Sequence, residues 1–130
     1  MKFIYPASEE QLSKIQWILD KNPEPGIVDI RASFNSSSIV AEETGSILGV
    51  ATIIWGDDAS ELYKLYVVPN HKRKGVGTAL ANKTIDILKE HNVKELLIEI
   101  AGESRPFWEN FILNHRTINF DYDKFSIAIT

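Results

Sequence analysis

One stretch, residues 61–80, constrains the fold more than any other part of the chain. Residues 61–68 are rich in Leu, Tyr and Val, which is typical of a strand, and Pro69 ends that strand because proline cannot donate to a ladder. Apolar residues at helical spacing begin at Val76. Gly75 and Gly77 lie between the two patterns. The sequence therefore predicts a strand that passes through a glycine-containing loop directly into a helix.

A loop of this kind favours an anionic ligand. Glycine lets the backbone approach an anion closely, and the first turn of a helix offers free N–H groups and a positive dipole end. Lys72, Arg73 and Lys74 add full positive charges beside the glycines, although the net charge of the chain is −4. An acidic chain is a poor general binder of nucleic acid. The local cluster instead predicts a small ligand such as a diphosphate with a nearby phosphate monoester.

Three interpretations of the glycine pair can be compared. A nucleotide-binding P-loop needs a lysine after its last glycine, where this chain has Thr78. A dinucleotide-binding fingerprint needs a third glycine, where this chain has Leu80. A glycine-rich turn without any ligand is the third interpretation, but it gives no reason for three adjacent cations.

The remaining elements follow from periodicity and from turn residues. Ser8 and Gln11 form a capping-box pattern that opens a helix, and Pro23 limits it. Thr44-Gly45 indicates a hairpin, and Asn92 is a suitable left-handed helix cap. The predicted strands are residues 2–5, 38–43, 46–55, 61–68, 95–100, 117–120 and 125–129. Helices are predicted after Ser8, from Val76 and at 104–113, whereas the pattern of residues 27–34 is ambiguous and leaves a short helix open.

This order of elements predicts the fold class. A strand, a long helix and another strand form a right-handed crossover, so residues 61–68 and 95–100 should run parallel. The other strands form a meander. We expect an α+β fold with one mixed, mostly antiparallel sheet flanked by helices. The 130 residues suffice for one domain and are too few for two, which predicts a single domain over residues 1–130.

Residues 65–80, LYVVPNHKRKGVGTAL, resemble the GNAT superfamily of N-acetyltransferases. The family pattern is a strand ending in V-x-P, followed by [Q/R]-x-x-G-x-[G/A] at the start of a helix. Lys72 occupies the usual Gln/Arg position and keeps the positive charge. The order of elements fits the family over nearly the whole chain. The resemblance implies a GNAT-like sheet whose central parallel pair splays apart at the cofactor site.

The resemblance implies acetyl-CoA as the acyl donor. In that pose the pantetheine arm pairs with the backbone of residues 65–67, the pyrophosphate lies on the amides of residues 73–78, and the Val67 N–H faces the oxyanion. Ser104 stands near the place of a usual asparagine contact. The implied cofactor-binding residues are Leu65, Tyr66, Val67, Lys72, Arg73, Lys74, Gly75, Val76, Gly77, Thr78, Ser104 and Trp108.

Acyl transfer to an amine needs a group that accepts the amine proton and a donor for the oxyanion. Glu61 lies on the strand where some members of the family carry a catalytic glutamate. Glu99 lies on the neighbouring strand, between Ile98 and Ile100. Either carboxylate is a candidate catalytic base, each is also explained as a solvated strand residue, and water is a third candidate.

The sequence departs from the family pattern at the position that usually serves the leaving thiolate. Many members place a tyrosine where this chain has Trp108. Indole donates a hydrogen bond but does not release its proton, so Trp108 can bind the sulfur without protonating it. His115 and Tyr122 are further candidates, each also explained as a structural or surface residue. The two leading functions are an N-acetyltransferase acting on a primary amine of a small molecule, peptide or protein, and a catalytically degenerate acyl-CoA-binding module; an interaction module without ligand is a third.

The composition excludes several kinds of site and predicts where the protein is located. The chain has no cysteine, which excludes a disulfide framework, a thiolate zinc site and a cysteine nucleophile, and no metal site is predicted. The absence of cysteine, of a signal-peptide pattern and of a long apolar run predicts a cytoplasmic protein without a membrane partner. The acidic net charge predicts that nucleic acid is not a partner. We expect the amine acceptor at residues 22–38 and 115–124. A homodimer is an open expectation from the family.

Overall fold

The computed structural model describes the backbone of residues 1–129 and their side chains except those of Asn119 and Phe120. The helices are α1 (Glu9–Lys21), α2 (Val76–Glu90) and α3 (Arg105–Phe111), with short 3-10 turns η1 (Pro69–His71) and η2 (Ile112–Asn114). The strands are β1 (Lys2–Ile4), β2 (Ser36–Glu43), β3 (Ser46–Ile54), β4 (Ala59–Val67), β5 (Glu95–Glu99), β6 (Thr117–Asp121) and β7 (Lys124–Ala128).

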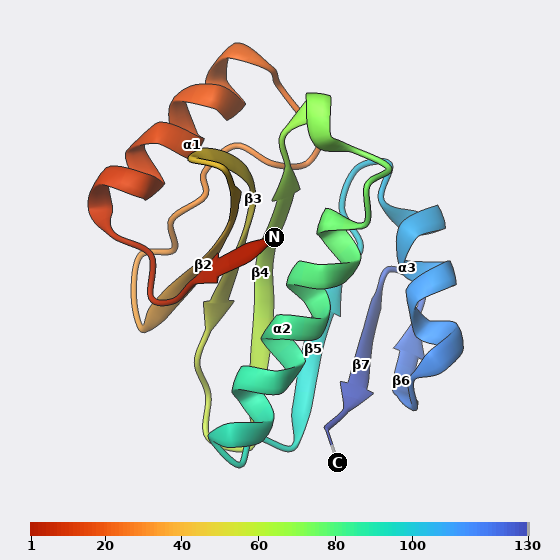
Figure 1. The fold of residues 1–130 in the computed structure, drawn as a ribbon. Helices are drawn as coiled ribbons and strands as arrows, with labels where there is room; N and C mark the ends of the chain where they lie inside the picture. Colours follow the sequence, from red (N-terminus) through yellow and green to blue (C-terminus); the bar gives the residue numbers. More distant parts are fainter. Residues whose placement is uncertain (130) are drawn as a thin grey trace.

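All of these strands join one sheet in the order β1-β2-β3-β4-β5-β7-β6 (Figure 1). Neighbouring strands are antiparallel except β4 and β5, which are parallel and are connected through α2. The predicted mixed α+β sheet with a central parallel pair is confirmed.

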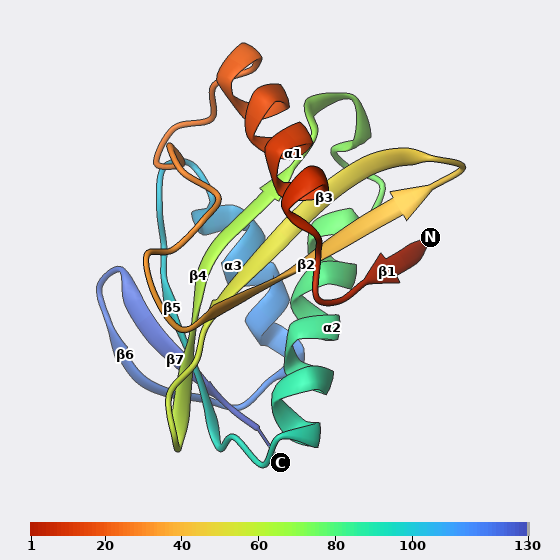
Figure 2. The same cartoon turned by 90° about the vertical axis from the view of Figure 1, so that its left-hand side faces the viewer.

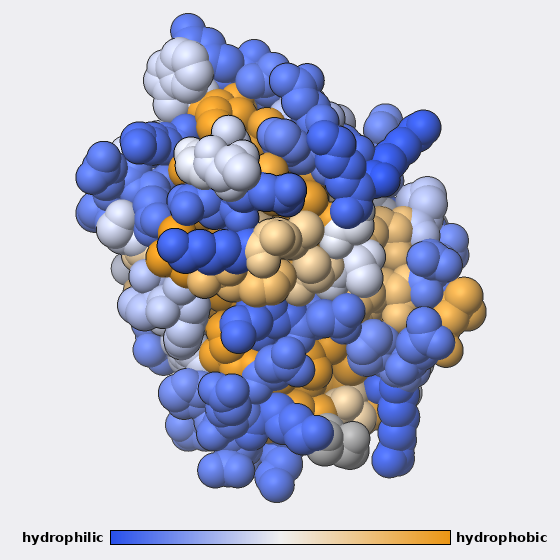
Figure 3. All heavy atoms as spheres, in the orientation of Figure 1, coloured by the Kyte–Doolittle hydropathy of each residue, from blue (hydrophilic) through white to orange (hydrophobic). Residues whose placement is uncertain are grey.

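Each face of the sheet has its own hydrophobic core. On one face α2 packs against β2, β3 and β4, and α3 packs against β7 (Figure 1); Leu80, Leu88 and Phe111 are buried there. On the other face α1 packs against the β2–β4 side of the sheet (Figure 2), where Ile15 and Leu19 are buried. The outer surface on the α2 side is largely hydrophilic, with hydrophobic side chains visible between the polar ones (Figure 3). The helices are thus anchored by their apolar stripes.

Two helix ends follow the sequence closely. The Ser8 hydroxyl accepts from the Gln11 N–H at 3.2 Å, and Gln11 Oε1 accepts from the Ser8 N–H at 2.8 Å, which is the predicted capping box. After α2, Asn92 has φ of 59° and ends the helix in the left-handed region, as predicted.

Residues 27–34, for which the sequence left a short helix open, form no helix. The segment follows an irregular path because side chains from other elements bind its backbone. Gln16 of α1 donates to the Val28 carbonyl and accepts from the Ile30 N–H, both at 2.9 Å. The Thr52 hydroxyl donates to the Ile30 carbonyl at 2.9 Å, and the Ile30 side chain is fully buried. These tertiary bonds replace the hydrogen bonds that a helix would supply.

A bulge in β4 opens the sheet. Thr52 pairs with Lys64 but Ile53 pairs with Leu62, so Tyr63 has no partner on β3. Pairing between β4 and β5 ends at Leu62 and Ile98, although β4 continues to Val67. The predicted splay of the parallel pair is therefore present, directly after the bulge.

Tyr66 provides a test of the smaller core. Its side chain is 1% exposed, and its hydroxyl has no hydrogen-bond partner among the residues that the structure describes. Burial raises the pKa of the Tyr66 hydroxyl above its usual value, and the negative charge of Glu24 raises it further. The phenol therefore stays neutral in the folded protein at a pH where the unfolded chain ionises it, so stability should fall as pH rises above about 10.

We predict that Tyr66→Phe leaves the free energy of unfolding unchanged or raises it by about 1 kcal/mol, because it removes an unpaired buried hydroxyl. The variant should also lose the part of the alkaline destabilisation that Tyr66 causes. Urea unfolding at neutral pH and above pH 10 measures both effects. Tyr66→Ala is the control for packing and should cost roughly 3 kcal/mol or more. A clear loss of stability in Tyr66→Phe at neutral pH would contradict the unpaired hydroxyl.

Candidate functional site

A cavity of about 370 Å³ opens where β4 and β5 separate. It is bounded on one side by the β4 edge, on another by the start of α2, and on a third by β5 and α3. The lining residues are 24–27, 62–65, Val67, Lys72, Arg73, 75–78, Ile98, Glu99, Ala101, Glu103, Ser104, Phe107 and Trp108. Most of the predicted cofactor-binding residues thus come together around one space.

The start of α2 presents free amides to this cavity. Arg73 and Gly75 have φ of 65° and 78°, which turn the chain from the end of β4 into the helix. The first helical hydrogen bond runs from the Ala79 N–H to the Gly75 carbonyl at 2.9 Å, so residues 76–78 have N–H groups without helical partners. A side chain at Gly77 would lie 3.2 Å from the Phe107 ring, so the small residue keeps this end of the helix open.

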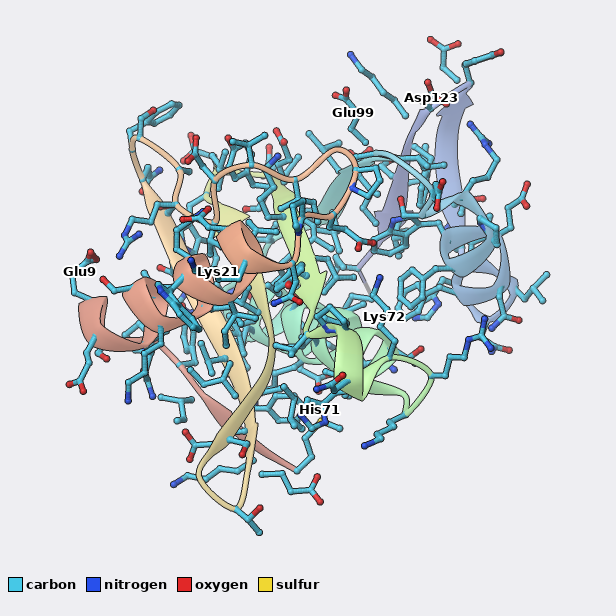
Figure 4. All side chains as sticks on the ribbon, turned by 90° about the horizontal axis from the view of Figure 1, so that it is seen from above. Glu9, Lys21, His71, Lys72, Glu99 and Asp123 are labelled. Atoms are coloured by element: carbon cyan, nitrogen blue, oxygen red, sulfur yellow. The ribbon has the colours of Figure 1, made fainter. Side chains whose placement is uncertain are left out.

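Two of the three predicted cations reach the cavity. Lys72 and Arg73 line it, whereas Lys74 is exposed and does not. Lys72 Nζ lies 2.8 and 3.0 Å from the two carboxylate oxygens of Glu24. Figure 4 shows Lys72 next to the light-green 3-10 turn η1, which ends one residue before it. Arg73 makes no ion pair with the described residues. The cavity therefore has one paired and one unpaired cation at this end.

The β4 edge beyond the bulge has backbone groups free for a ligand. The Val68 N–H donates to the Leu48 carbonyl of β3 at 2.9 Å. Because N–H groups alternate along a strand, the Val67 and Leu65 N–H groups point to the opposite edge, which β5 has left. The Tyr66 side chain is buried in the α1 core and does not line the cavity.

Trp108 is both a core residue and a wall of the cavity. It is 5% exposed and makes edge-on contacts with Phe107, Phe111 and Phe125, at centroid distances of 4.8, 5.6 and 5.9 Å. Its indole N–H has no hydrogen-bond partner among the described residues. The neighbouring Ser104 hydroxyl donates to the Ala101 carbonyl at 2.6 Å, which leaves only its lone pairs for a ligand.

The two candidate bases lie on the sheet face opposite α2. Leu96 and Ile98 point into the α2 core, so Glu95, Leu97 and Glu99 point the other way. Figure 4 shows Glu99 projecting away from Lys72. A second cavity, of about 280 Å³, lies on this face.

Glu61, Glu95 and Glu99 line the second cavity, with Lys124 at its edge. Glu99 also lines the first cavity, so the two spaces meet there, whereas Glu61 is half-buried and borders only the second. None of the three carboxylates forms an ion pair with the residues that the structure describes. The structure thus places the candidate bases at the far side of the splay from residues 72–78, the loop that leads into α2 and that we call the phosphate-type loop.

His115 and Tyr122 stay outside both cavities. His115 Nδ1 lies 2.9 Å from the Phe111 carbonyl oxygen, and its ring stacks on Phe111 at 4.4 Å. Tyr122 is 83% exposed in the turn between β6 and β7. In the two segments expected to bind the acceptor, residues 24–27 and Lys124 line a cavity, and the other described side chains of these segments do not.

Sequence reasoning missed residues 24–27 as part of the first cavity. The signal there was a Pro-Glu-Pro-Gly run, which indicates a turn but not its position in space. Nothing in the linear sequence pairs Glu24 with Lys72, because the two residues are distant along the chain. The ion pair is a product of the fold.

The described residues 1–129 contain neither a metal-binding cluster nor a membrane-spanning helix. No group of three or more His, Asp or Glu side chains there is arranged to hold a metal ion. No helix in the same range is both long enough and apolar enough to cross a membrane.

The model of the acetyltransferase (GNAT) family matches residues 5–111. The chain belongs to this family. The resemblance of residues 65–80 to GNAT proteins is therefore confirmed, and the splayed parallel pair is the GNAT arrangement. No curated protein matches the sequence.

Solved GNAT structures share the fold at low identity. Tetrahymena GCN5 has a TM-score of 0.74 and 19% identity, covering 100% of this chain and 97% of that one. The ribosomal-protein-S18-alanine N-acetyltransferase from Escherichia coli has a TM-score of 0.73 and 18% identity. The match covers 99% of this chain and 95% of that one. The PaiA N-acetyltransferase from Thermoplasma acidophilum, solved in complex with coenzyme A, has a TM-score of 0.68 and 13% identity, covering 98% of each chain.

Proposed function

We propose that this protein is an acetyl-CoA-dependent N-acetyltransferase that moves the acetyl group to a primary amine of a small molecule, peptide or protein. The observation that carries the proposal is the cation-bearing start of α2, which opens onto the same cavity as the free edge of β4. Membership of the GNAT family supports this reaction type. A GNAT neighbour solved with coenzyme A supports the choice of donor.

The lining of the first cavity fits coenzyme A. Lys72, Arg73 and the free amides of residues 76–78 would hold the diphosphate, because charged and N–H donors converge there. On the free backbone edge, the Leu65 N–H and the carbonyl groups of Leu65 and Val67 would pair with the amide groups of the pantetheine arm, which leaves the Val67 N–H for the thioester. Bound acetyl-CoA supplies an activated thioester to this site.

The chain's own groups then serve the transfer. The acceptor amine attacks the carbonyl carbon, so that a C–N bond forms and the C–S bond breaks. The Val67 N–H donates a hydrogen bond to the carbonyl oxygen as negative charge develops there. Glu61 or Glu99 accepts the proton that the amine loses. The unpaired indole N–H of Trp108 stabilises the departing sulfur, which leaves with the electron pair of the broken bond.

The acceptor enters from the face opposite α2. Glu61, Glu95 and Glu99 line the second cavity there without ion-pair partners among the described residues, and a cationic amine is attracted to such a wall. Because this cavity meets the first at Glu99, donor and acceptor approach each other through the gap between β4 and β5.

A second candidate function is an acyl-CoA-binding module without turnover. Trp108 favours it, because the indole is 5% exposed in an aromatic cluster and has no acidic proton to give to the thiolate. Both functions use the same cofactor cavity, so they differ only in catalysis.

Acetyl-CoA should stabilise the folded protein, since it binds the native state alone. At a concentration 100-fold above the dissociation constant the gain is about 2.7 kcal/mol, which thermal unfolding detects as a higher melting temperature. Thiol release with a library of primary amines measures turnover. Stabilisation without thiol release would favour the binding module, and no stabilisation would exclude both functions.

Gly75→Ala should weaken coenzyme A binding, because φ of 78° at this residue aims the amides at the start of α2. Gly45→Ala is a matched control, since Gly45 has φ of 82° and equally open surroundings but lies in the β2–β3 turn. Each variant should cost about 1 kcal/mol of stability from backbone strain. Isothermal titration calorimetry should show weaker binding for Gly75→Ala only; equal affinities would argue against an amide cradle.

The catalytic base can be found among the carboxylates of the second cavity. Glu61→Gln or Glu99→Gln should lower kcat by about 100-fold or more while coenzyme A affinity is kept, because only proton transfer is lost. Glu95→Gln is the control, since Glu95 lines the same cavity. The comparison requires steady-state rates with saturating acetyl-CoA. If kcat of neither Glu61→Gln nor Glu99→Gln falls further than kcat of Glu95→Gln, water is the base.

A further inference from the structure

The cofactor cavity is crossed by a turn that we call the strap, residues 23–27. The Ile27 N–H donates to the Glu24 carbonyl at 3.1 Å, and Gly26 has φ of 84°, so the turn is tight. It lies at the end of the molecule where β4 meets the loop before α2 (Figure 1). Glu24, Pro25, Gly26 and Ile27 all line the cavity.

The strap touches both sides of the opening between β4 and β5. On the β4 side, Lys64 Nζ donates to the Gly26 carbonyl at 3.4 Å. On the β5 side, the strap contacts the loop before α3 backbone to backbone. A Cβ at Gly102 would lie 2.2 Å from the Pro25 carbonyl oxygen, and one at Gly26 would lie 2.8 Å from the Gly102 nitrogen. The strap therefore bridges the splay.

One ion pair joins the strap to the phosphate-type loop. Both carboxylate oxygens of Glu24 lie within 3.0 Å of Lys72 Nζ, and the two side chains are 30% and 44% exposed. Such a pair is partly solvated and therefore modest in strength. It nevertheless places a negative charge on the cation that a diphosphate would need.

We propose that Glu24 is a positioning residue that holds Lys72 and the strap together in the empty protein, and that a diphosphate ligand takes Lys72 from Glu24 and releases the strap. The inference rests on the proposed coenzyme A site. A diphosphate carries more negative charge than one carboxylate and also reaches Arg73 and the free amides of residues 76–78, so it outcompetes Glu24. Cofactor binding thereby loosens one wall of the cavity.

Glu24→Gln should tighten coenzyme A binding by roughly two- to fivefold, because the ligand no longer competes with an ion pair of this exposure. The same substitution in a Lys72→Gln background should change the affinity by less than half of that, since the competitor acts through Lys72. Glu103→Gln is the matched control: Glu103 lines the same cavity, is exposed, and has no ion pair with the described residues. Calorimetry on the full chain measures the coenzyme A affinity of five proteins: wild type as reference, Glu24→Gln, Lys72→Gln, the double variant and Glu103→Gln.

Release of the strap has its own measurement. Hydrogen–deuterium exchange should become faster in peptides covering residues 23–27 when coenzyme A is added, while residues 76–78 exchange more slowly. Pantetheine, which has no diphosphate, should leave the strap unchanged. These two changes in opposite directions would not arise from a general tightening of the protein.

The outcomes separate this inference from the proposed function. Coenzyme A binding with equal affinity for wild type and Glu24→Gln, a gain matched by Glu103→Gln, or a gain that persists without Lys72 would overturn the role of Glu24 alone. Slower exchange of the strap in the complex would overturn its release. If neither wild type nor any variant binds coenzyme A, the proposed function itself fails and this inference falls with it.

Discussion

The structure depends on a parallel strand pair that is paired along only part of its length. The unpartnered Tyr63 bends β4, and hydrogen bonding to β5 ends at Leu62 and Ile98. A continuous pair would leave no room between the strands. Because pairing stops, backbone groups of β4 lose their partners on one edge and a cavity opens beside them. Unpaired backbone groups next to a cavity need a ligand or water, so the break in the sheet is itself the reason for a binding site.

The helix that connects the two strands brings charge to the same place. A right-handed crossover begins where β4 ends, so the start of α2 must lie at the splayed end of the pair. Leu80 and Leu88 fix the helix on the sheet by burial, and the free amides of residues 76–78 then point at the opening. Position and electrostatics are coupled, because the packing that anchors the helix also aims its positive end.

The site has opposite charges on its two sides. Lys72 and Arg73 lie at the α2 end, whereas Glu61, Glu95 and Glu99 lie on the face that α1 leaves open. An anionic donor and a cationic acceptor would therefore approach from different sides and meet at the gap. Glu24 departs from this division, since it brings a carboxylate to the cationic end and pairs with Lys72. A ligand that displaces Glu24 from Lys72 can therefore alter the shape of the site.

The sequence by itself determined the local features: the capping box at Ser8, the glycine loop before Val76 and the parallel pair that flanks α2. The first two depend on residues that are near one another in the chain, and the parallel direction of β4 and β5 follows from the order strand, helix, strand. Only the tertiary structure decided the path of residues 27–34, which Gln16 and Thr52 hold away from a helix. It also decided the bulge at Tyr63 and the pairing of Glu24 with Lys72, because these arise when distant segments pack together, and no local pattern encodes which partners they meet.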